Sequence, residues 1–254
     1  MFSCRSFLAS PIRRVAVLAI VTGLFGIAVP AWSTVSVSAR VPIGPDLADL
    51  GWRELTPPDS DPTRFEGRRD GSLMVSAESS ASFLYRDVAN QARGKPVLQW
   101  RWRVDKSSPP TDLSRKGGDD RPLAVHLWFP PDAAAESRFN VFDQALAWAF
   151  DVPLPGKVLT YVWGGTAAAG EKLDNPYLER DGVLIVLRPG DTPKGRWFRE
   201  SIDVSADYAA AFGSAAPPVA YIAVSADFDD TMGASMAMIA DIAFVADPTP
   251  RPQR

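Results

Sequence analysis

The strongest constraint on the fold is an eight-residue run, Val97 to Val104, in which apolar and polar side chains alternate. In an extended chain, Leu98, Trp100, Trp102 and Val104 would lie on one side, and Gln99, Arg101 and Arg103 on the other. Side chains alternate between the two faces of a strand with a period of two, whereas a helix repeats every 3.6 residues. The run therefore predicts a half-buried strand whose tryptophan face packs on a core.

Short runs of the same kind recur along the chain with turn residues between them. They occupy residues 51–55, 72–78, 82–88, 123–129, 157–163, 183–188, 196–204, 219–226 and 236–245. Helical patterns are confined to residues 141–150 and 205–212, the second ended by Gly213. Because long amphipathic helices do not alternate with the strands, we expect an all-β fold. The prediction is an antiparallel β-sandwich of the jelly-roll kind with one or two short helices.

The first residues have the pattern of a secretory signal peptide. Arginines precede an apolar stretch over residues 15–29, and small residues follow it around Ala31 and again before Ala39. We expect residues 1–39 to be removed after Sec export, which predicts a periplasmic or secreted protein without a transmembrane span in the mature chain. The single cysteine, Cys4, lies within this segment, so the mature chain has no thiol.

The rest of the chain divides by composition. Residues 40–71 are rich in proline, aspartate and glycine and predict a leader with one edge strand. Residues 72–247 hold the remaining strand patterns and predict one β-sandwich domain. Residues 248–254 form a proline-rich tail that we expect to be disordered.

Composition also excludes several functions. The formal net charge is −3 and no run of Lys or Arg is present, so we expect no binding to nucleic acid. Without a mature cysteine, a Cys nucleophile is impossible, and one histidine, His126, cannot build a usual zinc site. The chain carries no P-loop, no G-x-G-x-x-G and no G-x-S-x-G motif. No residue is therefore assigned a catalytic role.

Two aspartate-rich stretches are the main candidates for a site. Asp119 and Asp120 follow two glycines, a pattern that fits a turn but also offers oxygen ligands. Asp227, Asp229 and Asp230 crowd one loop, where repulsion calls for a cation or a basic side chain. No cofactor is certain; calcium, which takes six to eight oxygens, is the candidate. The spacing is not that of an EF-hand.

Four more side chains complete the candidate set of ligand-binding residues. His126 is either a hydrogen-bonded structural residue or a ligand. Glu200 is either a hydrogen-bond anchor or, across a cleft from an aspartate, one of two carboxylates for glycoside cleavage. Trp128 and Trp163 are the tryptophans that we expect to be exposed for stacking on sugar rings, because Gly164 follows Trp163 and would let a ligand approach.

Several motifs, in order along the chain, resemble a bacterial exported family known as domain of unknown function 3047. They are VLQWRWRV (97–104), KGGDDRPLA (116–124), LTYVWG (159–164), NPY (175–177), GRW (195–197), ADFDDT (226–231) and ADI (240–242). The strand 239–244 also resembles the last strand of galactose-binding-like jelly rolls. That likeness implies that Asp241 helps to hold a structural calcium ion with the 227–230 loop.

These observations predict an exported, non-catalytic binding module for a glycan or another cell-envelope component. One alternative is a carboxylate-dependent hydrolase or lyase that acts on polysaccharide. Another is a structural or protein-interaction module of the envelope. Geometry discriminates among them: acids that meet in an open cleft beside aromatic rings favour the first two. Carboxylates that are each tied to arginine or backbone N–H groups, without a cleft, favour the third.

Overall fold

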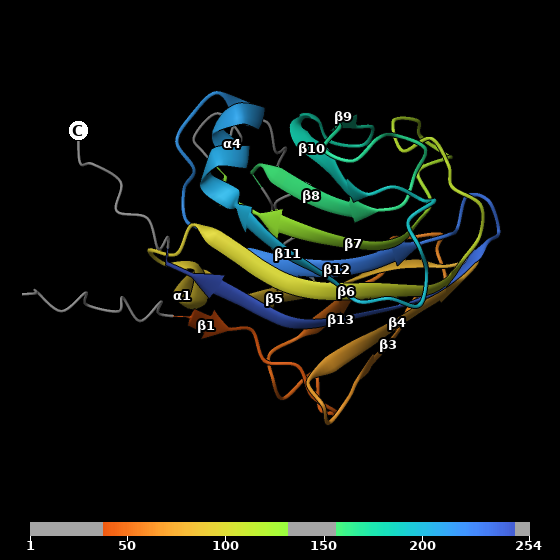
Figure 1. Ribbon diagram of the computed structural model, residues 1–254, viewed down its shortest axis with the longest axis horizontal. Coiled ribbons are helices and arrows are strands. Elements are labelled where there is room, and N and C mark those ends of the chain that lie inside the picture. Colours follow the sequence, from red (N-terminus) through yellow and green to blue (C-terminus); the bar gives the residue numbers. More distant parts are fainter. Residues whose placement is uncertain (1–37, 132–155, 247–254) are drawn as a thin grey trace, which may run out of the picture. The chain divides into compact units, whose positions relative to one another are not determined.

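The computed structural model describes residues 38–131 and 156–246, and every structural statement below refers to these residues (Figure 1). They form a sandwich of two β-sheets with two short helices. The predicted signal peptide, the predicted helix at 141–150 and the tail 248–254 fall outside the described residues, apart from Ser38 and Ala39. In the described part of the chain, no helix is both long and apolar enough to cross a membrane.

The first sheet has six strands and is antiparallel throughout. Its order is β11-β6-β13-β4-β3, and β1 pairs with the other end of β13. The bounds are β1 (Ser38–Arg40), β3 (Arg64–Gly67), β4 (Ser72–Glu78), β6 (Val97–Ser107), β11 (Phe198–Asp203) and β13 (Ala234–Val245). The alternating run Val97 to Val104 lies in β6, which pairs with β11 on one side and β13 on the other.

The second sheet has seven strands in the order β2-β5-β12-β7-β8-β10-β9. The bounds are β2 (Arg53–Leu55), β5 (Ala81–Asp87), β7 (Arg121–Trp128), β8 (Val158–Trp163), β9 (Lys172–Asn175), β10 (Glu179–Arg188) and β12 (Tyr221–Asp227). Neighbouring strands are antiparallel except β8 and β10, which run parallel. The sheet places β7 and β12 at its centre, so that side chains on their outer face are flanked on both sides.

The core lies between the facing surfaces of the two sheets. Trp100 and Trp102 of β6 are buried in it as predicted, and their rings pack edge-on with centroids 5.3 Å apart. Across the core, Trp100 meets Tyr161 of β8 at 5.7 Å. The all-β, jelly-roll sandwich predicted from the alternating runs is confirmed, and each of the ten runs falls on an observed strand.

The helices and the short strands were less predictable. Helix α4 (Val204–Phe212) matches the expected helix; Asp203 caps its start by accepting a 3.0 Å bond from the Ala206 N–H. Gly213 ends it with a left-handed φ of 71°. Strands β1, β3 and β9 and helix α1 (Ala89–Ala92) are additional. The leader therefore holds two strands, β2 and β3, and β1 includes Ala39, the expected cleavage position.

Candidate functional site

Strand β7 is buried on both faces, and this decides where a site can lie. Its inward residues Leu123, Val125 and Leu127 belong to the core between the sheets. The alternate residues His126 and Trp128 point to the opposite, outer face of the seven-stranded sheet, and they too are buried. A second group of side chains, separate from the core between the sheets, therefore packs around Trp128 on the outer face.

A cavity of about 380 Å³ opens on this outer face. It is lined by Pro57, Ala81, Phe83, Asp119, Arg121, His126, Trp128, Val158, Asn175, Tyr177, Leu178, Asp227 and Asp229. The volume lies in the range of sites for small molecules, which are mostly apolar with a few convergent polar groups. Here the apolar and aromatic side chains share the cavity with an acidic end.

The aromatic part of the cavity is built by neighbouring strands. Trp128 of β7 stacks on Tyr85 of β5 at 5.4 Å and meets Tyr221 of β12 at 6.1 Å. Phe83 of β5 lies edge-on to the His126 ring at 5.1 Å and to Trp128 at 6.5 Å. These cross-strand contacts hold the rings in place, so that the aromatic surface is formed before any ligand arrives.

His126 is a structural residue of this floor. Its ring nitrogens lie 3.0 Å from the Thr160 hydroxyl and 2.8 Å from the Ser225 hydroxyl. Burial, with Arg121 nearby, holds the pKa of His126 well below its ordinary value, so the ring is neutral. Of the two roles left open for His126, the contacts favour the hydrogen-bonded one over acid–base chemistry near neutral pH.

The acidic end is organised around Arg121, the first residue of β7, which is 5% exposed. Its Nη1 donates to Asp119 Oδ2 at 2.8 Å and its Nη2 lies 3.2 Å from Asp227 Oδ2. The Tyr177 hydroxyl donates to the other oxygen of Asp119 at 3.1 Å. One buried guanidinium thus joins the two aspartate stretches that the sequence placed more than a hundred residues apart.

Two carboxyl groups of the acidic end, those of Asp227 and Asp230, have raised pKa values. Burial raises the pKa of Asp227 to about 7; Asp119 and Asp229 add to the rise, and Arg121 opposes it. Burial, Asp119 and Asp229 together raise the pKa of Asp230 to about 6. The cluster is therefore crowded with negative charge that Arg121 only partly compensates.

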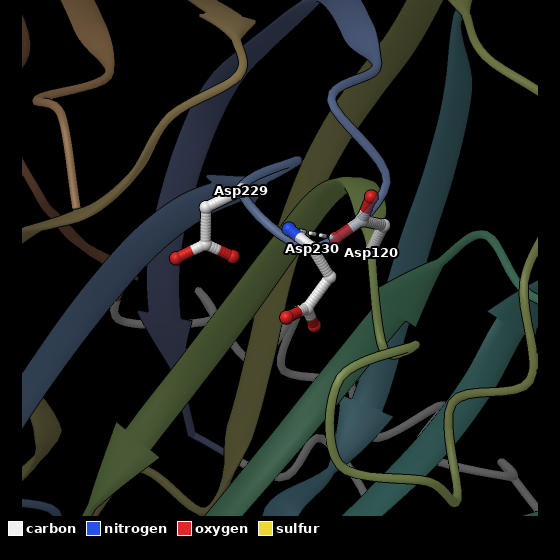
Figure 2. Close-up of side chains that lie close together, drawn as sticks. All are labelled: Asp120, Asp229 and Asp230. Carbon is white, nitrogen blue, oxygen red and sulfur yellow. Dashed lines mark hydrogen bonds between the residues drawn. The ribbon is translucent and has the colours of Figure 1, made fainter. Parts of the chain in front are cut away.

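The candidate calcium ligands lie partly together. Asp120, Asp229 and Asp230 each offer an oxygen, all within 4.8 Å of one another (Figure 2). Asp120, however, already accepts bonds from the backbone N–H groups of Asp230 at 3.4 Å and Thr231 at 3.0 Å, and from the Thr231 hydroxyl. Three carboxylates supply about half of the shell that calcium takes. The residues fit one side of a hard-ion site, and calcium stays a prediction.

Asp241 and Glu200 lie elsewhere, and each is paired with arginine. Asp241 accepts a 2.7 Å bond from Arg101 Nε on the six-stranded sheet. Glu200 accepts bonds from Trp102 Nε1 at 2.8 Å and from Arg188 Nε at 2.7 Å. Neither residue lines the cavity. The structure therefore separates Asp241 from the 227–230 loop and supports the hydrogen-bond-anchor alternative for both residues.

Trp163 requires a correction. It is 1% exposed and lies in the core, where it packs edge-on against Trp102 at 5.6 Å and Phe198 at 5.3 Å. The expectation that it is exposed for stacking is wrong. Gly164 serves close packing instead, since a side chain there would meet Pro122 Cδ at 2.9 Å. Trp128 does line the cavity, although its side chain is largely buried.

Sequence reasoning missed several residues of the site. Tyr177, 55% exposed, follows β9 and reaches the acidic end from the far edge of the sheet. Phe83 lies on β5. The alternating pattern alone does not show whether a side chain on the outer face of this strand contacts a ligand or packs against other side chains. Arg121 had a usable signal, because buried aspartates call for a nearby cation and it directly follows Asp120.

Fold and site together define a jelly-roll β-sandwich with an aromatic and acidic cavity on the outer face of one sheet. The chain belongs to the family described as "Protein of unknown function (DUF3047)", whose model matches residues 50–243. This confirms the resemblance found in the motifs. No curated protein matches the sequence.

Three solved structures are similar in fold. One is the endoglucanase cel12A from Rhodothermus marinus, at 11% identity and TM-score 0.44, over 82% of this chain and 98% of that one. Another is the xyloglucanase domain of NopAA from Sinorhizobium fredii, at 7% identity and TM-score 0.41, over 77% and 94%. The third is the CBM22-1-CBM22-2 tandem domain of Xyn10C from Paenibacillus barcinonensis, at 9% identity and TM-score 0.34, over 87% and 50%. Similarity at this level concerns the sandwich fold.

Proposed function

We propose that this chain is an exported, non-catalytic module that binds a saccharide of the cell envelope in the cavity on the outer face of the seven-stranded sheet. The observation that carries the proposal is the composition of that cavity. Preformed aromatic rings, Phe83 and Trp128 among them, occupy the same cavity as Asp119, Asp227 and Asp229. Aromatic faces pack on the apolar faces of sugar rings, and carboxylates accept hydrogen bonds from sugar hydroxyls.

Catalysis is the second candidate, and the raised pKa of Asp227, about 7, favours it. A general acid with such a pKa beside an ionised carboxylate is what glycoside cleavage requires. Asp227 is nevertheless held 3.2 Å from the buried guanidinium of Arg121, and Asp229 accepts a hydrogen bond from the Ser60 hydroxyl. Glycosidases keep their two carboxyls about 5 Å apart or more, with the scissile bond between them. Both carboxyls are thus engaged by neighbouring side chains of the protein, which is why binding is the primary proposal.

A purely structural role accounts for fewer of the contacts. Glu200, Asp241 and Asp120 are tied to arginines or backbone N–H groups, as such a role requires. Asp229, by contrast, lines a cavity that also contains exposed and half-buried aromatic side chains. A cavity of this kind is unnecessary for a scaffold.

A glycan array followed by calorimetry on each hit tests the proposal. Phe83→Ala should weaken binding at least about tenfold, because Phe83 is a half-buried wall of the cavity. Phe65→Ala is the matched control, since Phe65 is equally half-buried but belongs to the six-stranded sheet. An array without hits would overturn the proposal. So would hits whose affinity is the same for the wild type and for Phe83→Ala. Chromatography of each hit after long incubation separates binding from cleavage.

A further inference from the structure

The charges that line the cavity do not balance. The carboxylates of Asp119, Asp227 and Asp229 face a single cationic side chain among the described lining residues, Arg121. The two terminal nitrogens of Arg121 already contact Asp119 and Asp227. Asp229 Oδ2 accepts a 2.6 Å bond from the Ser60 hydroxyl, and no cationic group contacts Asp229 in the described structure. The cavity therefore carries an uncompensated carboxylate.

This carboxylate and the aromatic surface belong to the same cavity. Asp229 follows β12, the neighbour of both β5 and β7, which carry Phe83 and Trp128. Tyr177 reaches the acidic end from the other side through its bond to Asp119. A ligand that lays a sugar ring on Phe83 and Trp128 can therefore place a substituent at Asp229.

We propose that the preferred ligand is a saccharide that carries a primary amine, and that its ammonium group ion-pairs with Asp229. This inference rests on the proposed function and specifies its substrate class. The ammonium group supplies the positive charge that Arg121 cannot. N-acetylated sugars lack that charge, and uronic acids would bring a further negative charge to the cluster.

Electrostatics supply the discrimination. Hydrogen bonds to charged groups contribute roughly twice as much as neutral ones, and a like charge in the same place is repelled. The aromatic rings also favour a cation near their faces.

A metal ion fits the same charge less well. Of the three carboxylates that approach one another, Asp120 is buried and its oxygens already accept donors from Asp230 and Thr231. Asp229 alone of the three lines the cavity. One available carboxylate beside aromatic rings suits an ammonium group, whereas calcium needs several oxygens at once.

The test is calorimetry with four hexasaccharides at 50 mM salt, in buffer with EDTA. They are β-1,4-linked glucosamine, N-acetylglucosamine, glucose and, as the anionic sugar, α-1,4-linked galacturonic acid. We expect the glucosamine oligomer to bind at least about tenfold more tightly than its acetylated form, and galacturonic acid to be weakest. Asp229→Asn should bring the first two within about threefold of each other, because it removes the charge that distinguishes them. Asp229→Glu should keep the preference. Asp191→Asn is the control, because Asp191 is exposed and does not line the cavity, and it should change nothing.

The possible failures are distinguishable. Equal affinity for the glucosamine and glucose oligomers, or a preference that survives Asp229→Asn with unchanged melting temperature, overturns the amine inference but leaves saccharide binding intact. If none of the four sugars binds and the wider array is also empty, the proposed function falls. If Asp229→Asn fails to fold, Ser60→Ala, which removes the donor to Asp229, should alter the ratio between the glucosamine and glucose oligomers; an unchanged ratio overturns the inference.

Discussion

Replacing Arg121 by glutamine tests the electrostatics of the acidic end. The change leaves Asp119 and Asp227 without their buried partner. Removing one member of a buried ion pair costs about 3–5 kcal/mol. At pH 5 Asp227 is protonated in both proteins, because its pKa is about 7 in the wild type and Arg121 is the group that lowers it. The loss at pH 5 should therefore lie in that range.

At pH 8 the loss should be larger, and the sign follows from linkage. A carboxyl whose pKa is raised by folding stabilises the protein below its unfolded value and loses this contribution as pH rises through about 7. In the wild type Asp227 releases its proton above pH 7 next to Arg121, whereas in Arg121→Gln it retains the proton to higher pH. One pH unit above the pKa is equivalent to about 1.4 kcal/mol. We expect that much additional destabilisation at pH 8.

Urea denaturation at pH 5 and pH 8, with EDTA present, measures both losses. Arg121→Lys is the control. Lysine keeps the positive charge but cannot contact both aspartates through two separate nitrogens, so it should destabilise the protein less than glutamine does. The difference between the two pH values should also be smaller. A loss below about 1 kcal/mol for Arg121→Gln, or the same loss at both pH values, would contradict the reasoning.

Four further predictions concern separate parts of the molecule. Trp128→Ala should abolish saccharide binding in calorimetry and lower stability by about 3–5 kcal/mol, since Trp128 packs on Tyr85. His126→Gln should become more stable as pH falls from 7 to 5, by about 1.4 kcal/mol per unit or more, because the raised pKa values of Asp227 and Asp230 then act unopposed. In the wild type the low pKa of His126 opposes them, so urea titrations should show a smaller rise. Glu200→Gln should cost about 1–3 kcal/mol through Arg188 and leave ligand affinity unchanged. If calcium binds, millimolar calcium should raise the melting temperature of the wild type but not of Asp229→Asn; no rise in the wild type ends the calcium hypothesis.

The strands could be predicted because most of them face the core on one side only. In β6 the buried and partly exposed residues alternate, and the sequence repeats the alternation without a break. Strands β1, β3 and β9 were missed because they have only three or four residues each, too few for a period of two to stand out. Their pairing depends on neighbours, β13, β4 and β10, that the local sequence does not specify.

The candidate site could be predicted in its residue types but not in its assembly. The sequence identified the aspartates that call for compensation, yet Asp120 is satisfied by Thr231, 111 residues away, and Asp227 by Arg121. Strand β7 shows the second difficulty. It is buried on both faces, so a period of two cannot say which side belongs to the core and which to a cavity. β7 lies at the centre of its sheet, and only the packing of the six-stranded sheet against one of its faces separates Val125 from His126 and Trp128.

The same central position explains why the outer face suits binding. A residue on an edge strand has a neighbour on one side, whereas Trp128 is flanked by rings from β5 and β12, which fix its orientation. Arg121 at the start of β7 is held by Asp119, from the loop before β7, and by Asp227, the last residue of β12, so the acidic end is equally fixed. A surface with both ends preformed loses little conformational entropy on binding. If the rings and acids were instead ordered by the ligand, Phe83→Ala and Asp229→Asn would show coupled losses in a double-mutant cycle; we expect their effects to add within about 0.5 kcal/mol.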